Sequence, residues 1–316
     1  MRLSKVVVLV SLGCALSCGG AIRHSALQTT TQILTLTQPA LQQDNDYDFA
    51  AAAIPGALKT IEGFWIVDPS TTSENLLPIL TEGFCQYATA FVEDEWEIAK
   101  FAKNQDAIAE TNEHASKMFT RCFNYALKQL PSGFDKDLFS TPEVAKKRID
   151  SIGIEHRTAF MWAALALGGE INHNLTRVEM LSYLPVVKQM LDHVIELDAK
   201  HVPSSCDANC KVHLALPHIG LGMIASAASA QFGGNADEAA KEFQKALDIT
   251  GDKMLLARAL WGDRVGIMTN NRKLFHDQLV KVLETDPAIW PEQRLANEVA
   301  HRRARRYLSH EKDLFQ

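Results

Sequence analysis

Apolar residues recur every three or four positions over most of this chain, which is the spacing of one face of an α-helix. Strand-like alternation is absent from the sequence, and glycine and proline fall mostly between the periodic segments. Thr71, Thr176 and Asn235 each stand at the start of a periodic segment with a glutamate three residues later, as in a helix capping box. The pattern predicts an all-α protein.

Two of the predicted helices share one order of small, bulky and small residues, namely Ala115, Phe119 and Cys122 in the first and Ala239, Phe243 and Ala246 in the second. This order is the second-helix signature of the tetratricopeptide repeat, in which small residues let the paired helix approach closely. Prolines after Asp68 and Asp286 end helices in the way these repeats favour. Because the spacing between repeats is irregular, we expect tetratricopeptide-like helical hairpins in a compact superhelix.

Residues 1–18 have the pattern of an export signal. Arg2 and Lys5 precede an apolar run from Val6 to Leu12, and small residues around two cysteines follow. Cys18 resembles the cysteine of a bacterial lipobox, which is acylated and becomes the mature N-terminus, and Cys14 is the alternative lipidation site. A plain secretory signal with an incidental cysteine is the other interpretation.

The rest of the chain divides into two parts. Residues 19–46 are rich in Gln, Thr and Ala and predict a tether with a short helix, and residues 47–316 predict one helical domain. No segment after the leader is expected to span a membrane. Because Gly19 follows Cys18 where an aspartate would favour inner-membrane retention, we expect a bacterial envelope protein that is lipid-anchored, faces the periplasm and resides in the outer membrane.

The charge of the chain is moderately acidic, with a formal net value of −6, so nothing in it points to a nucleic-acid partner. The dense basic run Arg302, Arg303, Arg305 and Arg306 alternates with apolar residues. We interpret this run as the solvated face of an amphipathic helix, with contact to an anion or a lipid headgroup as the alternative.

Cysteines in the body of the chain predict one disulfide. Cys206 and Cys210 lie in a polar loop after Pro203 and are close enough in sequence to close a small ring. Cys85 and Cys122 fall on apolar helix faces, where we expect plain core thiols.

Motifs for catalysis or metal binding are absent from the sequence. His201 and His213 are interpreted as loop and helix-face residues, and no His-Glu-x-x-His, Gly-x-Ser-x-Gly or phosphate-loop pattern occurs. Consecutive carboxylates in the run Glu93-Asp94-Glu95-Trp96-Glu97 point in different directions around a helix, so this run predicts a solvated helix end. We therefore expect no enzyme, no metal and no cofactor.

Three segments, taken together, resemble the T component of tripartite ATP-independent periplasmic (TRAP) transporters, a family of tetratricopeptide-like lipoproteins. They are the stretch from Ala53 through Glu95, the stretch from Gly233 to Leu247, and the arginine-rich closing helix with its Asp313-Leu314-Phe315 tail. The segments Gly168–Asn172 and Cys206–Cys210 depart from the family pattern.

This resemblance implies an accessory component that binds a periplasmic solute-binding protein. It also implies a homo-oligomer whose subunits carry an apolar channel for a hydrophobic or organic-acid ligand. Candidate ligand-binding residues are five aromatic side chains and two polar anchors, namely Phe84, Tyr87, Phe91, Trp162 and Trp261 with Asn172 and Arg258. Ordinary core packing is the alternative for each aromatic residue, and pairing with a carboxylate is the alternative for Arg258. A general envelope scaffold for protein–protein interaction is the alternative function, and an enzyme with a cryptic site ranks third.

Overall fold

The computed structural model describes residues 24–227 and 234–315, which form helices and connecting loops with no strand in either range. The all-α prediction is confirmed. The export signal and both candidate lipidation sites, Cys14 and Cys18, lie outside the described residues. A first helix covers residues 24–36. The elements that follow are α2 (Gln38–Gln42), α3 (Tyr47–Val67), α4 (Pro69–Tyr87), the π-helical turn η1 (Ala88–Val92), α5 (Glu93–Phe101), α6 (Gln105–Leu127), α7 (Phe134–Leu138), α8 (Pro142–Asp150), η2 (Ile154–His156), α9 (Arg157–Asn172), α10 (Val178–Leu181), α11 (Leu184–Lys200), α12 (Ala208–Ala225), α13 (Ala236–Thr250), α14 (Leu255–Met268), α15 (Arg272–Glu284), η4 (Pro287–Ile289), η5 (Pro291–Gln293), α16 (Arg294–Ser309) and α17 (Glu311–Leu314).

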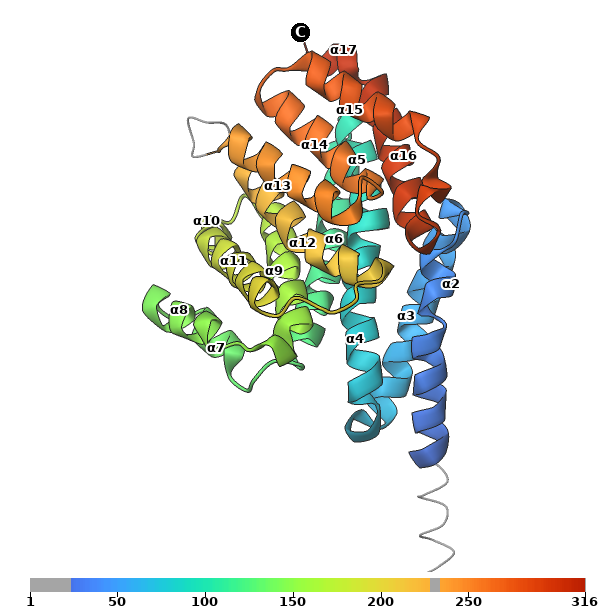
Figure 1. Ribbon diagram of the computed structural model, residues 1–316, viewed down its shortest axis with the longest axis vertical. Helices are drawn as coiled ribbons and strands as arrows, with labels where there is room; N and C mark the ends of the chain where they lie inside the picture. Colours follow the sequence, from blue (N-terminus) through green and yellow to red (C-terminus); the bar gives the residue numbers. More distant parts are fainter. Residues whose placement is uncertain (1–23, 228–233, 316) are drawn as a thin grey trace, which may run out of the picture.

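Consecutive helices pack as hairpins that stack along the molecule (Figure 1). Helix α3 pairs with α4, α12 with α13 and α14 with α15, whereas α6 pairs with α9 across the short excursion of α7 and α8. The closing helix α16 packs on α14 and α15 and also reaches α2 and α3. Helix α16 therefore bridges the last hairpin and the helices α2 and α3 near the start of the described chain.

Helix boundaries confirm some of the capping predictions. The Asn235 side chain accepts a hydrogen bond from the Glu238 amide at the start of α13. Thr71 and Thr176 are not caps, so those two predictions are wrong. The N-cap of α4 is Asp68, which is followed by Pro69 in the first helical turn, where proline is favoured. Helix α10 begins after Arg177, and no side chain caps it.

The repeated small, bulky, small pattern packs against glycines of the neighbouring helix. Phe119 of α6 lies against Gly169 of α9, where an added Cβ would meet its ring at 2.6 Å. Phe243 of α13 lies against Gly222 of α12, where the same distance is 3.0 Å. Both phenylalanines are buried. Gly169 therefore makes room for a ring in the same way as Gly222.

By length and composition alone, α3 is long and apolar enough to cross a bilayer, with 21 residues and an 18-residue stretch whose mean hydropathy is 1.2. The expectation that no later segment reaches that threshold is therefore wrong. One such helix is weak evidence for a membrane span, and α3 carries Pro55 and the buried Glu62. Glu62 accepts hydrogen bonds from Arg121 at 3.0 Å and from the Tyr125 hydroxyl at 2.6 Å, both on α6. These contacts bind α3 to the helical body.

Residues 24–42 are helical and pack against the helical body, where the sequence predicts a tether with a short helix. Thr31 is fully buried and accepts a hydrogen bond from the Asn75 side chain of α4 at 3.0 Å. Helix α2 contacts α16. Part of this polar stretch therefore packs on the folded body. Composition alone does not distinguish such a segment from a free tether.

The acidic run of α5 and the arginine-rich helix α16 neutralise one another in what we call the α5–α16 ion cluster. Its members from α5 and α16 are Glu93, Asp94, Glu97, Arg302, Arg303 and Arg306. Asp94 accepts from Arg306 at 2.6 Å and from Arg302 at 2.7 Å. Arg306 also donates to Glu97, and Arg303 to the carbonyl oxygen of Thr89 in η1.

Burial of this cluster overturns two sequence-based interpretations. Only 1% of Asp94 and 2% of Arg303 is exposed, so neither run is simply a solvated helix face. Arg305 and Glu95 keep the exposed positions that the sequence predicts, and the side chain of Arg302 is also partly exposed. Burial by itself would raise the pKa of Asp94, but the guanidinium groups of Arg306 and Arg302 hold it below its ordinary value.

Asp263 of α14 lies beside this cluster and behaves in the opposite way. Burial raises the pKa of Asp263 from 3.8 to about 6, although the Arg264 guanidinium lowers it. A carboxyl group whose pKa is higher in the folded state stabilises the fold fully below pH 3.8, and this contribution is lost as the pH rises through 6.

We expect Gly169→Ala to lower the free energy of unfolding by about 1 kcal/mol or more, because the new methyl group meets a buried ring. The matched control is Gly63→Ala on α3, where nothing lies within 4 Å of an added Cβ. That change should raise stability by about 0.5–1 kcal/mol through helix propensity. Urea unfolding measures both, and equal effects would contradict the packing described for Phe119.

We expect Asp263→Asn to flatten the dependence of stability on pH between about 4 and 6.5. The parent protein should lose about 2 kcal/mol over this range through Asp263, which is most of the roughly 3 kcal/mol that a pKa shift from 3.8 to about 6 gives over the full titration. Urea unfolding at the two ends of the range measures the difference. The control is Asp277→Asn, on an exposed face of α15, which should leave the parent's dependence unchanged. An unaltered profile in Asp263→Asn would show that this carboxyl does not titrate as described.

Candidate ligand-binding cavity

A cavity of about 710 Å³ lies among the N-terminal helices, α3, α4, α9, α12 and α16. Its walls are mostly apolar, and the apolar side chains are Pro39, Leu41, Ile54, Ala57, Leu58, Ile61, Pro78, Ile79, Ala90, Ala159, Val212, Met254, Leu256, Leu295, Ala296 and Val299. Six of its lining residues are exposed and mark where the wall reaches the surface, which we call the mouth: Thr35, Pro39, Pro78, Glu155, Thr158 and Asn209. This size and composition are typical of sites for small organic ligands.

The polar end of the cavity is built from α4, α9 and α12. Glu82 of α4 accepts a hydrogen bond from Gln86 at 2.8 Å on one carboxylate oxygen and from His213 of α12 at 3.3 Å on the other. The imidazole of His213 stands edge-on to the indole of Trp162, with 6.0 Å between ring centroids. The Nε1–H of Trp162 is buried and has no hydrogen-bond partner.

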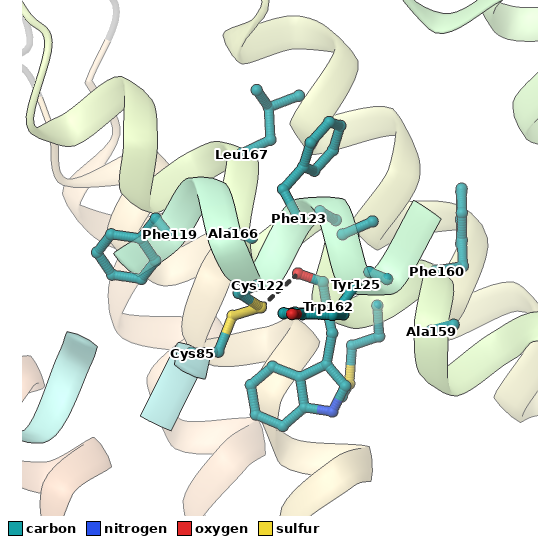
Figure 2. Close-up of a cluster of buried hydrophobic side chains, with 14 of the residues drawn as sticks. Cys85, Phe119, Cys122, Phe123, Tyr125, Ala159, Phe160, Trp162, Ala166 and Leu167 are labelled. Carbon is teal, nitrogen blue, oxygen red and sulfur yellow. Dashed lines mark hydrogen bonds between the residues drawn. A yellow bond between two sulfur atoms is a disulfide. The ribbon is translucent and has the colours of Figure 1, made fainter. Parts of the chain in front are cut away.

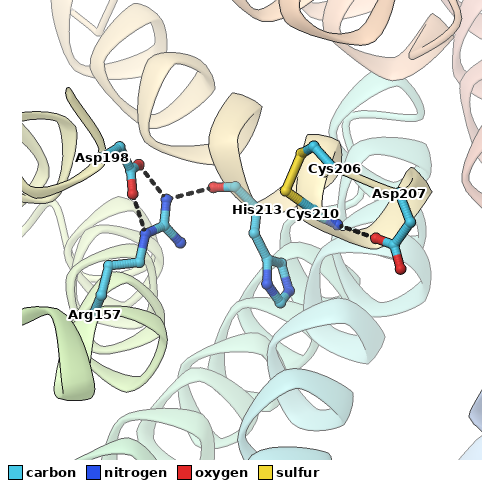
Figure 3. Close-up of a disulfide and its surroundings, with 6 residues drawn as sticks. All are labelled: Arg157, Asp198, Cys206, Asp207, Cys210 and His213. Atoms are coloured by element: carbon cyan, nitrogen blue, oxygen red, sulfur yellow. Dashed lines mark hydrogen bonds and ion pairs between the residues drawn. A yellow bond between two sulfur atoms is a disulfide. The ribbon is translucent and has the colours of Figure 1, made fainter. Parts of the chain in front are cut away.

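Arg157 fixes the position of His213. Its guanidinium donates two hydrogen bonds to Asp198 of α11, at 2.8 and 2.6 Å, and a third to the carbonyl oxygen of His213 at 2.8 Å (Figure 3). The Cys206–Cys210 disulfide joins the loop before α12 to its first turn, and Asn209 of the cavity mouth lies between these cysteines. The start of α12 is thus held by an ion pair and a covalent link.

A second disulfide joins Cys85 of α4 to Cys122 of α6, whose Cα atoms are 5.3 Å apart. The prediction of plain thiols at these positions is wrong, because the small residues that let the helices approach also bring the two sulfurs together. Figure 2 shows this disulfide next to Trp162, whose carbonyl oxygen lies 4.0 Å from the Cys122 sulfur. Cys85 itself lines the cavity.

Of the seven candidate ligand-binding residues, Tyr87 and Trp162 line this cavity. Burial and then the Glu95 carboxylate raise the pKa of Tyr87, so its phenol stays protonated. Phe84 stacks on Tyr125 in the core, and Phe91 packs between Tyr47 and Tyr87. The structure therefore brings two of the five aromatic candidates to the cavity and places two beside it in the core.

The three remaining candidates lie away from the cavity wall. Arg258 is buried and donates to Asp252 at 2.5 Å and to Gln278 at 2.6 Å, which is the carboxylate pairing given as its alternative. Trp261 packs on the core of α12–α14, and Asn172 is half-buried at the end of α9. Their ligand-binding roles stay predictions without support from this cavity.

Glu82, Gln86 and His213 line the cavity, although none of them was predicted from the sequence to bind a ligand. The spacing of Glu82 and Gln86 by one helical turn is a signal that could have linked these two. His213 joins them from 131 positions further along the chain, a distance that no local pattern bridges. Within the ranges that the structure describes, no group of three or more His, Cys, Asp or Glu residues is arranged to hold a metal ion.

Removing either disulfide by paired Cys→Ala changes should lower stability, by amounts that depend on the loop each one closes. The chain-entropy model gives about 4 kcal/mol for Cys85–Cys122 and about 2 kcal/mol for Cys206–Cys210. Sequence separations of 37 and 4 residues underlie the difference. Urea unfolding of both variants under oxidising conditions measures the two losses, and a larger loss at Cys206–Cys210 would contradict this order.

Comparison with known protein families identifies the family of this chain. Residues 43–315 fit the sequence profile of the family described as TRAP transporter T-component, whereas no curated protein is similar enough in sequence to be matched. The matched region runs from just before α3 to the end of α17 and contains most of the cavity wall. The chain therefore belongs to the TRAP transporter T-component family, whose members are accessory components of a transport system.

Proposed function

We propose that this protein binds an apolar ligand in the cavity and acts with a periplasmic solute-binding protein, without catalysing a reaction. The observation that carries the proposal is the cavity of about 710 Å³ with apolar walls, one polar end and an exposed mouth. Such a volume suits a small organic ligand, and a mouth of exposed residues leaves a route for its exchange with a partner. The hydrophobic and organic-acid ligands implied by the family resemblance both fit this size.

We also propose that acyl chains on Cys18, or on Cys14, hold the protein at the envelope membrane with its helical domain in the periplasm. Several acyl chains together anchor a protein firmly, whereas a single chain does so only marginally. Outer-membrane residence follows from the glycine after Cys18. Homo-oligomer formation, which the family resemblance implies, is part of the same proposal.

Native mass spectrometry of the purified protein tests the ligand-binding part. We expect a small molecule to be retained by the parent protein and lost from Ala57→Trp, because Ala57 of α3 lines the cavity. The matched control is Ala52→Trp, at an exposed position of the same helix, which should keep the ligand. Retention in both variants would place the ligand elsewhere, and an empty parent protein would favour a scaffold for protein–protein interaction.

Co-purification with a solute-binding protein encoded beside the gene tests the partner. The expected result is a complex under gentle conditions that passes ligand from one protein to the other. If the two proteins remain separate with and without ligand, the transport partnership proposed here fails.

A further inference from the structure

The turn between α3 and α4 carries exposed apolar side chains at one end of the molecule (Figure 1). Ile66 and Val67 are the last two residues of α3, and each is 61% exposed. Pro69 follows in the first turn of α4 and is exposed as well. Exposure by itself does not identify what covers these side chains. The position at which the described chain begins supplies that information.

The described chain begins beside this turn. Nδ1 of His24 lies 2.9 Å from the hydroxyl of Thr71 in the first turn of α4. Cys18, the proposed acylation site, stands six positions before His24, and six residues span at most about 20 Å when fully extended. The alternative site, Cys14, extends this limit to about 35 Å. Because acyl chains on the cysteine lie in the bilayer, the α3–α4 turn is kept close to the lipid surface.

Polar groups at the turn are paired within the protein, which lowers the cost of bringing the turn to a membrane. The Asp68 carboxylate caps α4 and accepts a hydrogen bond from the Ser70 hydroxyl at 2.6 Å. The Nε1–H of Trp65 donates to the Ser73 hydroxyl at 3.1 Å, and Nζ of Lys128 lies 5.3 Å from the centroid of the indole. Tryptophan and lysine both suit the headgroup region, where an apolar body meets lipid and a polar tip meets water.

We propose that the α3–α4 turn docks on the lipid surface of the envelope membrane, with Ile66 and Val67 inserted among the headgroups. The inference rests on the proposed acyl anchor and adds a second contact to it. Acyl chains fix where the chain meets the membrane, whereas the turn fixes which end of the domain faces the bilayer. Helix α3 is about 30 Å long, and Arg302 of α16 lies over the ring of Tyr47 at its first residue. Docking by the turn therefore points α16 away from the membrane.

Fluorescence quenching tests the docking in the full-length, acylated protein, reconstituted into phosphatidylcholine vesicles whose acyl chains carry a nitroxide. A bimane label is attached at Gly63→Cys, an exposed position one helical turn before Val67 where nothing lies within 4 Å of an added Cβ. The control label is at Lys312→Cys, an exposed position on α17 at the opposite end of the molecule. We expect quenching at position 63 to exceed quenching at position 312 at least about twofold, because the docked turn lies at the headgroups.

Flotation of the protein with the vesicles separates the anchor from the docking. Equal quenching at the two positions in protein that floats would overturn the docking and leave the acyl anchor standing. Protein that does not float would overturn the anchor, and the docking with it. Efficient disulfide cross-linking between two copies at position 63, without quenching there, would assign the turn to a contact between copies and overturn the docking on lipid.

Paired serine substitutions test the two apolar side chains. Ile66→Ser combined with Val67→Ser should reduce quenching at position 63 to the level at position 312, because the turn loses its apolar contact with lipid. The matched control is Ile267→Ser on α14, where an isoleucine is also exposed, and it should leave quenching unchanged. All three positions are exposed, so urea unfolding should give the stability of the parent protein. Equal quenching in the paired variant and the control would overturn the role of Ile66 and Val67.

Discussion

Charge neutralisation between α5 and α16 is the constraint on which the arrangement of the whole chain depends. Burying Asp94 and Glu97 is unfavourable unless cations accompany them, and Arg303 and Arg306 of the closing helix supply those cations. The pairing draws the last long helix against the first third of the chain. Leu295 and other residues of α16 thereby become part of the cavity wall, opposite walls contributed by α3 and α4. The cavity exists because the two ends of the domain are fastened together.

Within this frame, two disulfides and an ion-paired arginine fix the cavity's polar end. One disulfide ties Cys85 to α6 beside Trp162, another braces the loop before α12, and Arg157 fixes the backbone at His213. Preorganised groups cost less to bring to a ligand than groups that must be ordered on binding. In an otherwise apolar cavity, a few positioned polar groups make specificity depend on where the polar atoms of the ligand lie.

Local pattern in the sequence was sufficient for the helical class, several helix boundaries, the repeated packing motif and two cavity residues, Tyr87 and Trp162. It failed where a residue's environment depends on a partner far along the chain. Asp94 and Arg306 each have the pattern of a solvated charge, and only their meeting across 212 positions makes them buried. The same holds for Glu82 with His213. Helical periodicity identifies which face is apolar, but it does not say which polar residues will find one another.

One wall of the cavity belongs to a stretch that precedes the family match. Residues 43–315 carry the family's sequence profile, yet Thr35, Gln38, Pro39, Leu41 and Gln42 all border the cavity. Most of the cavity wall therefore comes from the region that matches the family, and one part of it comes from the sequence before that region. A protein truncated to residues 43–315 would keep the whole region that identifies its family, but its cavity would lack the wall residues contributed by the preceding stretch. Substitutions among these N-terminal wall residues can change the shape of the cavity without altering the region by which family members are recognised.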